Sequence, residues 1–225
     1  MQKGLSLITN FGCKTNCEYC IWKDHIFNSI NQNIFTCLYV LNNEIKKEKI
    51  EKFSISGGGD PFNNVSSNIQ FWNEINKICK ENNVKVDIHS SYLNFKKDFI
   101  KYNNIYQELK SNTNRIVLHL SVERYDENKI FDISREFKLR INFVVTNKLS
   151  LTFLNKVEEY SKKLNIQLAY RELMFNESIK PTEELSEFCK SIHKRYKNGR
   201  YVYQNDYNRY IMPNGKLYEN FLSKE

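Results

Sequence analysis

The sequence predicts an α/β fold built around a parallel sheet, and three observations support this prediction. Runs of strand-like composition alternate with segments of helical periodicity along the chain. The runs recur at intervals of 25 to 47 residues, the spacing of βαβ units. With 225 residues, 40% of them hydrophobic, the chain can bury a core of its own. We therefore expect a single domain over residues 1–225.

The first predicted strand precedes a cluster of cysteines, and five further runs complete the set. These strands are predicted at 5–9, 52–56, 84–89, 115–121, 140–145 and 166–171. Apolar residues spaced by three and four predict helices at 34–45, 69–79, 153–164 and 185–196. Asn68 or Ser67 would cap the second helix and Thr182 the last one.

The last part of the chain changes character. From about 201 to 221 it is rich in tyrosine and contains a turn at 212–216. We interpret 209–212 and 216–221 as a β-hairpin that extends the domain. Its tyrosines are expected to serve packing.

Composition narrows the choice of partners. The net charge of +8 comes from lysines spread along the chain, without an Arg-rich block that also carries aromatic residues. We therefore expect no nucleic-acid partner. No segment is apolar for long enough to cross a bilayer, and the N-terminus lacks a signal-peptide pattern. These features predict a cytoplasmic protein without a membrane partner.

Three cysteines directly after the first strand are the main chemical feature. Cys13, Cys17 and Cys20 have the spacing C-x3-C-x2-C, and the ends of parallel strands are where chemistry collects. Three thiolates can hold three irons of a [4Fe-4S] cluster and leave the fourth iron open. A zinc site completed by His25 and a disulfide framework are the alternatives. The remaining cysteines are expected to be buried thiols: Cys37, Cys79 and Cys189.

This spacing, with Tyr19 before the third cysteine, resembles the signature of the radical S-adenosylmethionine (SAM) enzymes. A second motif follows the second strand and supports the resemblance. It consists of Gly57, Gly58, Gly59 and Asp60 followed by a proline. It is similar to the Gly-Gly-Glu-Pro motif of that family, whose backbone carbonyls bind the SAM amino group. The Asp in place of Glu also resembles the activases of anaerobic ribonucleotide reductases.

The resemblance covers about residues 5 to 175 and implies a partial (β/α)6 radical SAM barrel, here with a C-terminal β-hairpin. It also implies SAM contacts at the ends of strands three to five, for which the candidates are Ser91, Ser121, Glu123 and Asn147. Arg124 would pair either with the SAM carboxylate or with a neighbouring acidic side chain, Glu123 or Asp126. The substrate candidates rest on position alone: His89, Tyr170, Arg171 and Glu172.

The activity implied is that of a radical SAM enzyme with two cofactors, a [4Fe-4S] cluster and SAM. One electron from the reduced cluster cleaves SAM, and the 5′-deoxyadenosyl radical abstracts a substrate hydrogen. A flavodoxin- or ferredoxin-like protein would supply the electron. A small molecule or nucleotide is the favoured substrate. The alternatives are a glycyl-radical activase, a peptide-modifying enzyme, and a non-catalytic iron–sulfur binding or sensing module.

Overall fold

The computed structural model describes residues 4–22, 31–174, 176–203 and 208–219. The chain divides into two compact units. Unit 1 comprises Met1–Thr15, Trp22–Ile116 and Asp206–Glu225, and unit 2 comprises Asn16–Ile21 and Val117–Asn205. One boundary therefore falls inside the cysteine segment. The single domain expected from the sequence stays a prediction.

Unit 1 contains a sheet whose strands follow the order β3-β2-β1-β8-β9. Its strands are β1 (Gly4–Thr9), β2 (Lys52–Gly57), β3 (Lys85–Ser90), β8 (Asn208–Ile211) and β9 (Leu217–Tyr218). Its helices are α1 (Ile34–Glu48), α2 (Ile69–Asn82), α3 (Phe95–Asp98), η1 (Ile100–Tyr102) and α4 (Asn103–Asn112). Strand β1 is central and pairs in parallel with β2 and with β8, whereas β8 and β9 pair antiparallel.

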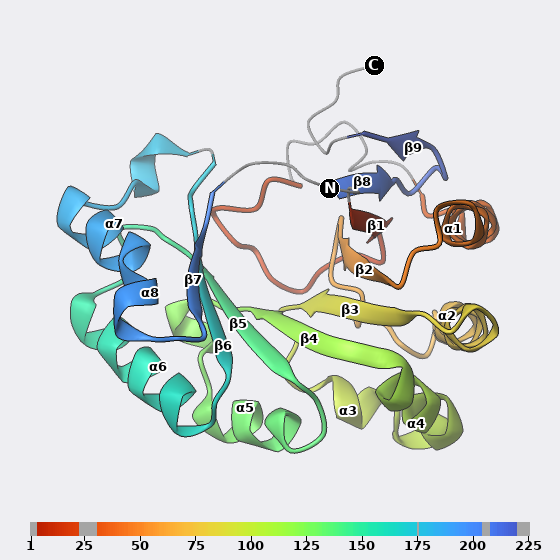
Figure 1. Ribbon diagram of the computed structural model, residues 1–225, viewed down its shortest axis with the longest axis horizontal. Helices are drawn as coiled ribbons and strands as arrows, with labels where there is room; N and C mark the ends of the chain where they lie inside the picture. Colours follow the sequence, from red (N-terminus) through yellow and green to blue (C-terminus); the bar gives the residue numbers. More distant parts are fainter. Residues whose placement is uncertain (1–3, 23–30, 175, 204–207, 220–225) are drawn as a thin grey trace. The chain divides into compact units, whose positions relative to one another are not determined.

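The core of unit 1 forms where α1 and α2 lie against the sheet (Figure 1). Leu7 of β1, Ile55 of β2 and Leu41 of α1 are fully buried. Aromatic stacking extends this core, because the ring of Phe62 lies 5.1 Å from that of Trp72. Burial of large side chains on both strands and helices fixes the register of β1 against β2. The end of β1 is thereby set against the end of β2.

Unit 2 contains the parallel strands of the second half of the chain. Its strands are β5 (Leu139–Val144), β6 (Gln167–Arg171) and β7 (Gly199–Val202), and β4 (Thr113–His119) crosses the boundary between the units. Its helices are η2 (Val122–Arg124), α5 (Glu127–Ser134), α6 (Leu151–Lys163), η3 (Glu177–Ile179), α7 (Glu183–Lys190) and α8 (Ile192–Arg195). Strand β6 pairs in parallel with β5 and with β7.

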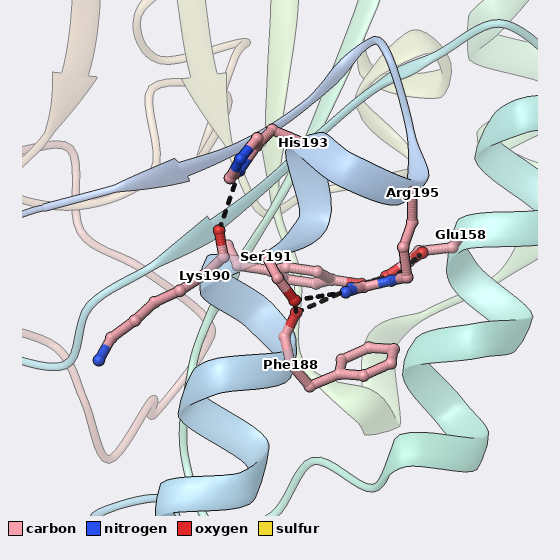
Figure 2. Close-up of polar contacts among 7 residues, drawn as sticks. Glu158, Phe188, Lys190, Ser191, His193 and Arg195 are labelled. Carbon is pink, nitrogen blue, oxygen red and sulfur yellow. Dashed lines mark hydrogen bonds and ion pairs between the residues drawn. The ribbon is translucent and has the colours of Figure 1, made fainter.

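An ion pair between a half-buried arginine and a buried glutamate joins three helices of unit 2 (Figure 2). Arg195 of α8 donates from Nε and Nη2 to the two oxygens of Glu158, at 3.1 and 2.7 Å. Its other bonds go to the Ser191 hydroxyl and the Phe188 carbonyl at the end of α7. The guanidinium also lies 3.7 Å from the centre of the Phe188 ring. These contacts hold α6, α7 and α8 together over strands β5 to β7.

The predicted fold class is confirmed: parallel strands alternate with helices, and the hairpin β8–β9 ends the described chain. The prediction departs from the structure at two places within residues 185–202. Strand β7 was not expected; it pairs with β6, and its Gly199 lies where a Cβ would stand 2.5 Å from Ile192. The helix predicted at 185–196 is interrupted at Ser191. Residues 204–207 and 220–221 of the predicted hairpin lie outside the described residues.

Of the two predicted N-caps, one makes the expected side-chain hydrogen bond and the other does not. The hydroxyl of Thr182 accepts from the Leu185 N–H and caps α7. Asn68 occupies the N-cap position of α2, but its side chain makes no capping bond. Instead its amide donates to the carbonyls of Asn63 and Asn64, which stabilises the preceding turn.

Candidate functional site

In unit 1, the start of the cysteine segment is joined to the glycine segment by hydrogen bonds. The N–H of Gly58 donates to the carbonyl of Thr9 at 2.8 Å. The N–H of Asp60 donates to the carbonyl of Gly12 at 2.9 Å, and Gly12 has a φ of +76° that suits glycine. The amide of Asn63 donates to the Phe11 carbonyl at 2.7 Å. The residues that lead into the cysteine motif are therefore anchored to the glycine motif within this unit.

Close approach of backbone explains the glycines of the second motif. A Cβ at Gly58 would overlap the indole ring of Trp22. A Cβ at Gly59 would stand 2.5 Å from the Gly12 carbonyl oxygen, and a Cβ at Gly57 would overlap the Gly59 carbonyl. Gly59 therefore lets the loop lie against Gly12, Gly58 leaves room for the Trp22 ring, and Gly57 leaves room for the loop's own backbone.

Asp60 is buried, and four hydrogen bonds occupy its carboxylate. Oδ1 accepts from the Phe62 N–H at 3.0 Å and from the Ser90 hydroxyl at 2.7 Å. Oδ2 accepts from the N–H and the hydroxyl of Ser91, at 2.7 and 2.9 Å. The structure thus brings together two candidates, Asp60 and Ser91, and makes them a bridge between the ends of β2 and β3. His89, one residue before this bridge, is half-buried.

Cys13 is the cysteine of the motif that lies in unit 1, and it is exposed. Its sulfur lies 2.8 Å from the hydroxyl of Thr15 and accepts from the Thr15 N–H at 3.4 Å. The ammonium of Lys14 lies 5.7 Å from the centre of the Tyr92 ring, a cation–π contact that ties the segment to the region after β3.

In unit 2, the segment Asn16–Ile21 carries Cys17, Tyr19 and Cys20. A turn with a hydrogen bond from the Cys20 N–H to the Cys17 carbonyl, at 3.2 Å, brings both half-buried cysteines to one loop. The Tyr19 hydroxyl donates to the Leu120 carbonyl after β4. Burial, and after it the charge of the neighbouring Cys17, raises the pKa of Tyr19, so its phenol keeps its proton.

Arg124 reaches the same loop from η2. Its Nη2 lies 3.0 Å from the sulfur of Cys17 and 3.4 Å from the hydroxyl of Tyr19, and its Nε donates to the Ser121 hydroxyl at 3.3 Å. Its Nη1 is buried and has no hydrogen-bond partner among the described residues. The expected ion pair with Asp126 is not formed, because that carboxylate accepts from the Lys129 N–H and pairs with the Lys129 ammonium at 3.3 Å.

Two further contacts hold this loop, and sequence reasoning missed both. Lys148 donates to the carboxylate of Glu18 at 2.6 Å, an ion pair whose side chains are each half-exposed. The amide of Asn176 donates to the Glu18 carbonyl at 3.2 Å. Asn176 has a φ of +77°, a left-handed conformation that asparagine tolerates. Its residue type is therefore the one local signal at this position. Neither residue belongs to a recognisable motif.

The other SAM candidates lie at the ends of β4 and β5. Glu123 is exposed, and a hydrogen bond from Ser121 lowers the pKa of its carboxyl group. Asn147 is exposed as well, and its amide and N–H donate to the carbonyls of Ser178 and Ile179. Asn147 therefore supports the loop at η3, while Ser150 caps α6.

The substrate candidates at the end of β6 differ in burial. Tyr170 is fully buried, and its hydroxyl donates to Glu158 at 3.4 Å. We therefore do not include Tyr170 among the substrate contacts that we propose. Arg171 and Glu172 are half-buried, and the Glu172 N–H donates to the Val202 carbonyl of β7.

The chemistry of the thiols distinguishes the cysteines of the motif from the others. All six are free, and those of the motif are exposed or half-buried. Burial raises the pKa of Cys37 to about 11 and that of Cys79 and Cys189 to about 12. Thiolates are the ligands of iron, so the buried thiols are poor ligands and the motif supplies the suitable donor set. Within the described residues no group of three His, Cys, Asp or Glu side chains could hold a single metal ion. His25 lies outside the described residues.

Solved structures share this fold at low sequence identity. SuiB from Streptococcus suis bound to S-adenosylmethionine aligns over 100% of this chain and 62% of its own, with a TM-score of 0.70 and 16% identity. SuiB bound to the precursor peptide SuiA aligns over 91% of this chain and 49% of its own, with a TM-score of 0.63 and 16% identity. The enzyme anSMEcpe with bound AdoMet and the Cp18Cys peptide aligns over 89% and 63%, with a TM-score of 0.55 and 16% identity.

The chain thus spans about three fifths of the length of the first of these proteins. No curated protein matches the chain in sequence. Among the helices that the structure describes, none combines the length and the apolar character required to span a bilayer. A family model described as a 4Fe-4S single cluster domain matches residues 5–137, more than half of the chain. The resemblance seen in the motifs is therefore confirmed, and the chain belongs to the family of 4Fe-4S single cluster domains.

Proposed function

We propose that the protein is a radical SAM enzyme that binds a [4Fe-4S] cluster through Cys13, Cys17 and Cys20. The observation that carries this proposal is the hydrogen bonding between the start of the cysteine segment and the glycine loop, from Gly58 to Thr9 and from Asp60 to Gly12. The residues directly before Cys13 and the glycine loop are thereby built as one local structure of unit 1. A module that only binds or senses through a cluster would not need that loop.

The residues of the chain have distinct tasks in this proposal. When bound, the cluster and SAM supply one-electron cleavage and a radical that abstracts hydrogen. The backbone of Gly57–Gly59 offers its carbonyls to the SAM amino group, and Asp60 fixes that backbone through its bonds to Phe62 and Ser91. In unit 2, Ser121, Glu123 and Asn147 offer hydroxyl, carboxylate and amide groups at strand ends, where polar parts of SAM would be bound.

The test of this function uses anaerobic protein reconstituted with iron and sulfide. We expect an EPR signal on reduction with dithionite, a change in that signal when SAM is added, and release of 5′-deoxyadenosine. Cys17→Ala should abolish the cluster and the release. Cys79→Ala, which removes a buried thiol outside the motif, is the matched control and should retain both. A cluster that SAM does not affect, or release that survives Cys17→Ala, would contradict the proposal.

We propose a peptide as the substrate. SuiB has been solved with its precursor peptide and anSMEcpe with a peptide, and both share this fold. This support now outweighs the preference for a small molecule or nucleotide that the sequence suggested. Arg171 and Glu172 at the end of β6 remain the proposed substrate contacts, together with His89 near the end of β3. A flavodoxin- or ferredoxin-like protein in a reducing cytoplasm is the proposed electron donor.

The substrate class can be tested with fractions of the host cell. We expect a peptide fraction to stimulate 5′-deoxyadenosine release by the reconstituted enzyme. The matched control is the same fraction after complete proteolysis to amino acids, which should not stimulate release. Stimulation that survives proteolysis, or that appears only with the nucleotide fraction, would return the assignment to a small molecule or nucleotide.

A further inference from the structure

We propose that Arg124 is a redox-tuning residue, whose hydrogen bond to the sulfur of Cys17 raises the reduction potential of the bound cluster. This inference rests on the proposed function, because it assumes that Cys17 is a cluster ligand. It concerns a group that the sequence motifs do not include. Arg124 follows β4 in sequence, and it reaches the cysteine segment only through the fold of unit 2.

The geometry around Arg124 supports a bond directed at sulfur. Nη2 lies 3.0 Å from the Cys17 sulfur, within the range for a nitrogen donor and a sulfur acceptor. Nε donates to the Ser121 hydroxyl, and Nη2 also approaches the Tyr19 hydroxyl. These contacts hold the guanidinium on two sides, so its direction is set before any ligand binds.

The charge of Arg124 helps to lower the pKa of the neighbouring Glu123 carboxyl, but Arg124 forms no close ion pair with a carboxylate among the described residues. In the part of the chain that the structure describes, no carboxylate lies within ion-pair distance of it, and Asp126 pairs with Lys129 instead. Its Nη1 is buried and unpartnered there. A buried N–H without an acceptor carries a free-energy cost, which an anionic group beside Cys17 would relieve. A thiolate ligand with its iron and sulfide is such a group.

The direction of the effect follows from electrostatics. Reduction adds one electron, and hence one negative charge, to the cluster and its thiolates. A guanidinium donating to a ligand sulfur stabilises the reduced state more than the oxidised one, and partial burial limits screening by water. Hydrogen bonds to the sulfurs are among the factors that set cluster potentials. Removing Arg124 should therefore make the cluster harder to reduce.

The test measures the midpoint potential of the cluster in the full-length protein without SAM, by EPR-monitored titration with dithionite. For Arg124→Met we expect the equilibrium constant for reduction to fall about tenfold, a shift of about 59 mV to lower potential for one electron. Lys148→Met is the matched control. It removes a positive charge that also contacts the cysteine segment, through Glu18 rather than through sulfur. For Lys148→Met we expect the equilibrium constant for reduction of the cluster to change by less than about twofold.

The possible outcomes are distinguishable. A lower potential in Arg124→Met but not in Lys148→Met supports the proposal, while equal potentials in wild type and Arg124→Met overturn it. Equal shifts in both variants also overturn it, because they indicate a general effect of charge. If Arg124→Met does not assemble a cluster, the same comparison is made with Arg124→Gln. Its side chain is neutral and too short to place a donor where the guanidinium lies. A wild-type protein without any cluster would instead refute the proposed function.

Discussion

Two arginines of unit 2 show how the same side chain serves the fold in one place and the candidate site in another. Every nitrogen of Arg195 donates to a partner: Nε and Nη2 to Glu158, Nη1 to Ser191, and Nη2 also to the Phe188 carbonyl (Figure 2). Arg124 has no carboxylate partner among the described residues, and its Nη1 is buried without an acceptor there. A guanidinium with all donors used stabilises the protein, whereas one with a donor left over is suited to bind an anion.

The largest effect is expected when the Arg195 ion pair is broken. Arg195→Met leaves Glu158, which is 2% exposed, as a buried charge without its partner. We expect the free energy of unfolding to fall by about 3–5 kcal/mol. Urea denaturation followed by circular dichroism measures this change. Arg124→Met should change it by about 1 kcal/mol or less, because it also removes a buried N–H that has no partner.

The double variant Glu158→Met with Arg195→Met is the control for this comparison. Replacing both charges with apolar side chains removes the uncompensated carboxylate, so part of the lost stability should return. If Arg195→Met destabilised the protein no more than Arg124→Met does, the distinction between the two arginines would be wrong.

The exposed and the buried cysteines are expected to differ in their rate of alkylation. Burial raises the pKa of Cys37 from the ordinary 9.0 to about 11, and its thiol lies against the Met212 carbonyl. At pH 8 its thiolate fraction should be about a hundredfold lower than that of a thiol with the ordinary pKa. We expect iodoacetamide to modify Cys13, which is exposed, at least a hundredfold faster than Cys37 in the folded apoprotein. Peptide mapping by mass spectrometry measures the two rates.

The denatured protein provides the control for reactivity, because in urea the six cysteines should react at similar rates. Fast modification of Cys37 in the folded protein would contradict its placement in the core. It would also reopen the possibility that a cysteine outside the motif binds iron.

The comparison also shows what the sequence could and could not predict. The alternation of strands and helices gave the parallel α/β fold, because periodicity reports which face of each element is buried. The cysteine and glycine motifs located the site, since both lie in loops directly after strands. Strand β7 was missed because it is short, and because the polar and aromatic composition of residues 199–202 resembles the hairpin that follows.

The contacts of the site were less accessible to prediction. Arg124 was expected to pair with the SAM carboxylate, with Glu123 or with Asp126, and its contact with the sulfur of Cys17 was not foreseen. Tyr170 was expected at a strand end facing substrate, but its hydroxyl reaches Glu158 inside unit 2. The first contact joins residues 107 positions apart, and the second joins residues 12 positions apart. Local periodicity does not determine which of several donors a side chain meets in the folded protein.

Asp60 resembles Arg195 in that both oxygens of its carboxylate accept hydrogen bonds within the protein. Each carboxylate oxygen accepts a backbone N–H, that of Phe62 on Oδ1 and that of Ser91 on Oδ2. The amide in Asp60→Asn has one oxygen and can satisfy only one of the two. We expect the free energy of unfolding to fall by about 2 kcal/mol and the affinity for SAM to weaken, because the glycine loop loses its anchor. Urea denaturation and isothermal titration calorimetry measure the two effects.

The control for Asp60 is Ser91→Ala, which removes a hydroxyl and retains the N–H bond to the carboxylate. It should cost about 1 kcal/mol of unfolding free energy, roughly half the effect of Asp60→Asn. Unchanged stability and SAM affinity in Asp60→Asn would show that the carboxylate does not position the glycine loop.

The smallest effect is expected at Asp126, which forms its ion pair with Lys129 and not with Arg124. The Lys129 N–H, to which Asp126 is bonded at 3.1 Å as the N-cap of α5, holds its pKa below the ordinary 3.8. A lowered pKa in the folded state means a stabilisation that is present above pH 3.8 and is lost as the pH falls through the folded value. Asp126→Asn keeps an acceptor for the cap but cannot ionise.

The urea midpoint of the wild type should therefore exceed that of Asp126→Asn by a modest, constant amount at neutral pH, and this difference should shrink as the pH is lowered below 3.8. The same variant also tests Arg124. Because Asp126 is committed to Lys129, its substitution should leave the cluster potential as in wild type. A higher potential in Asp126→Asn would mean that this carboxylate already offsets the charge of Arg124, and that the two arginines differ less than their contacts indicate.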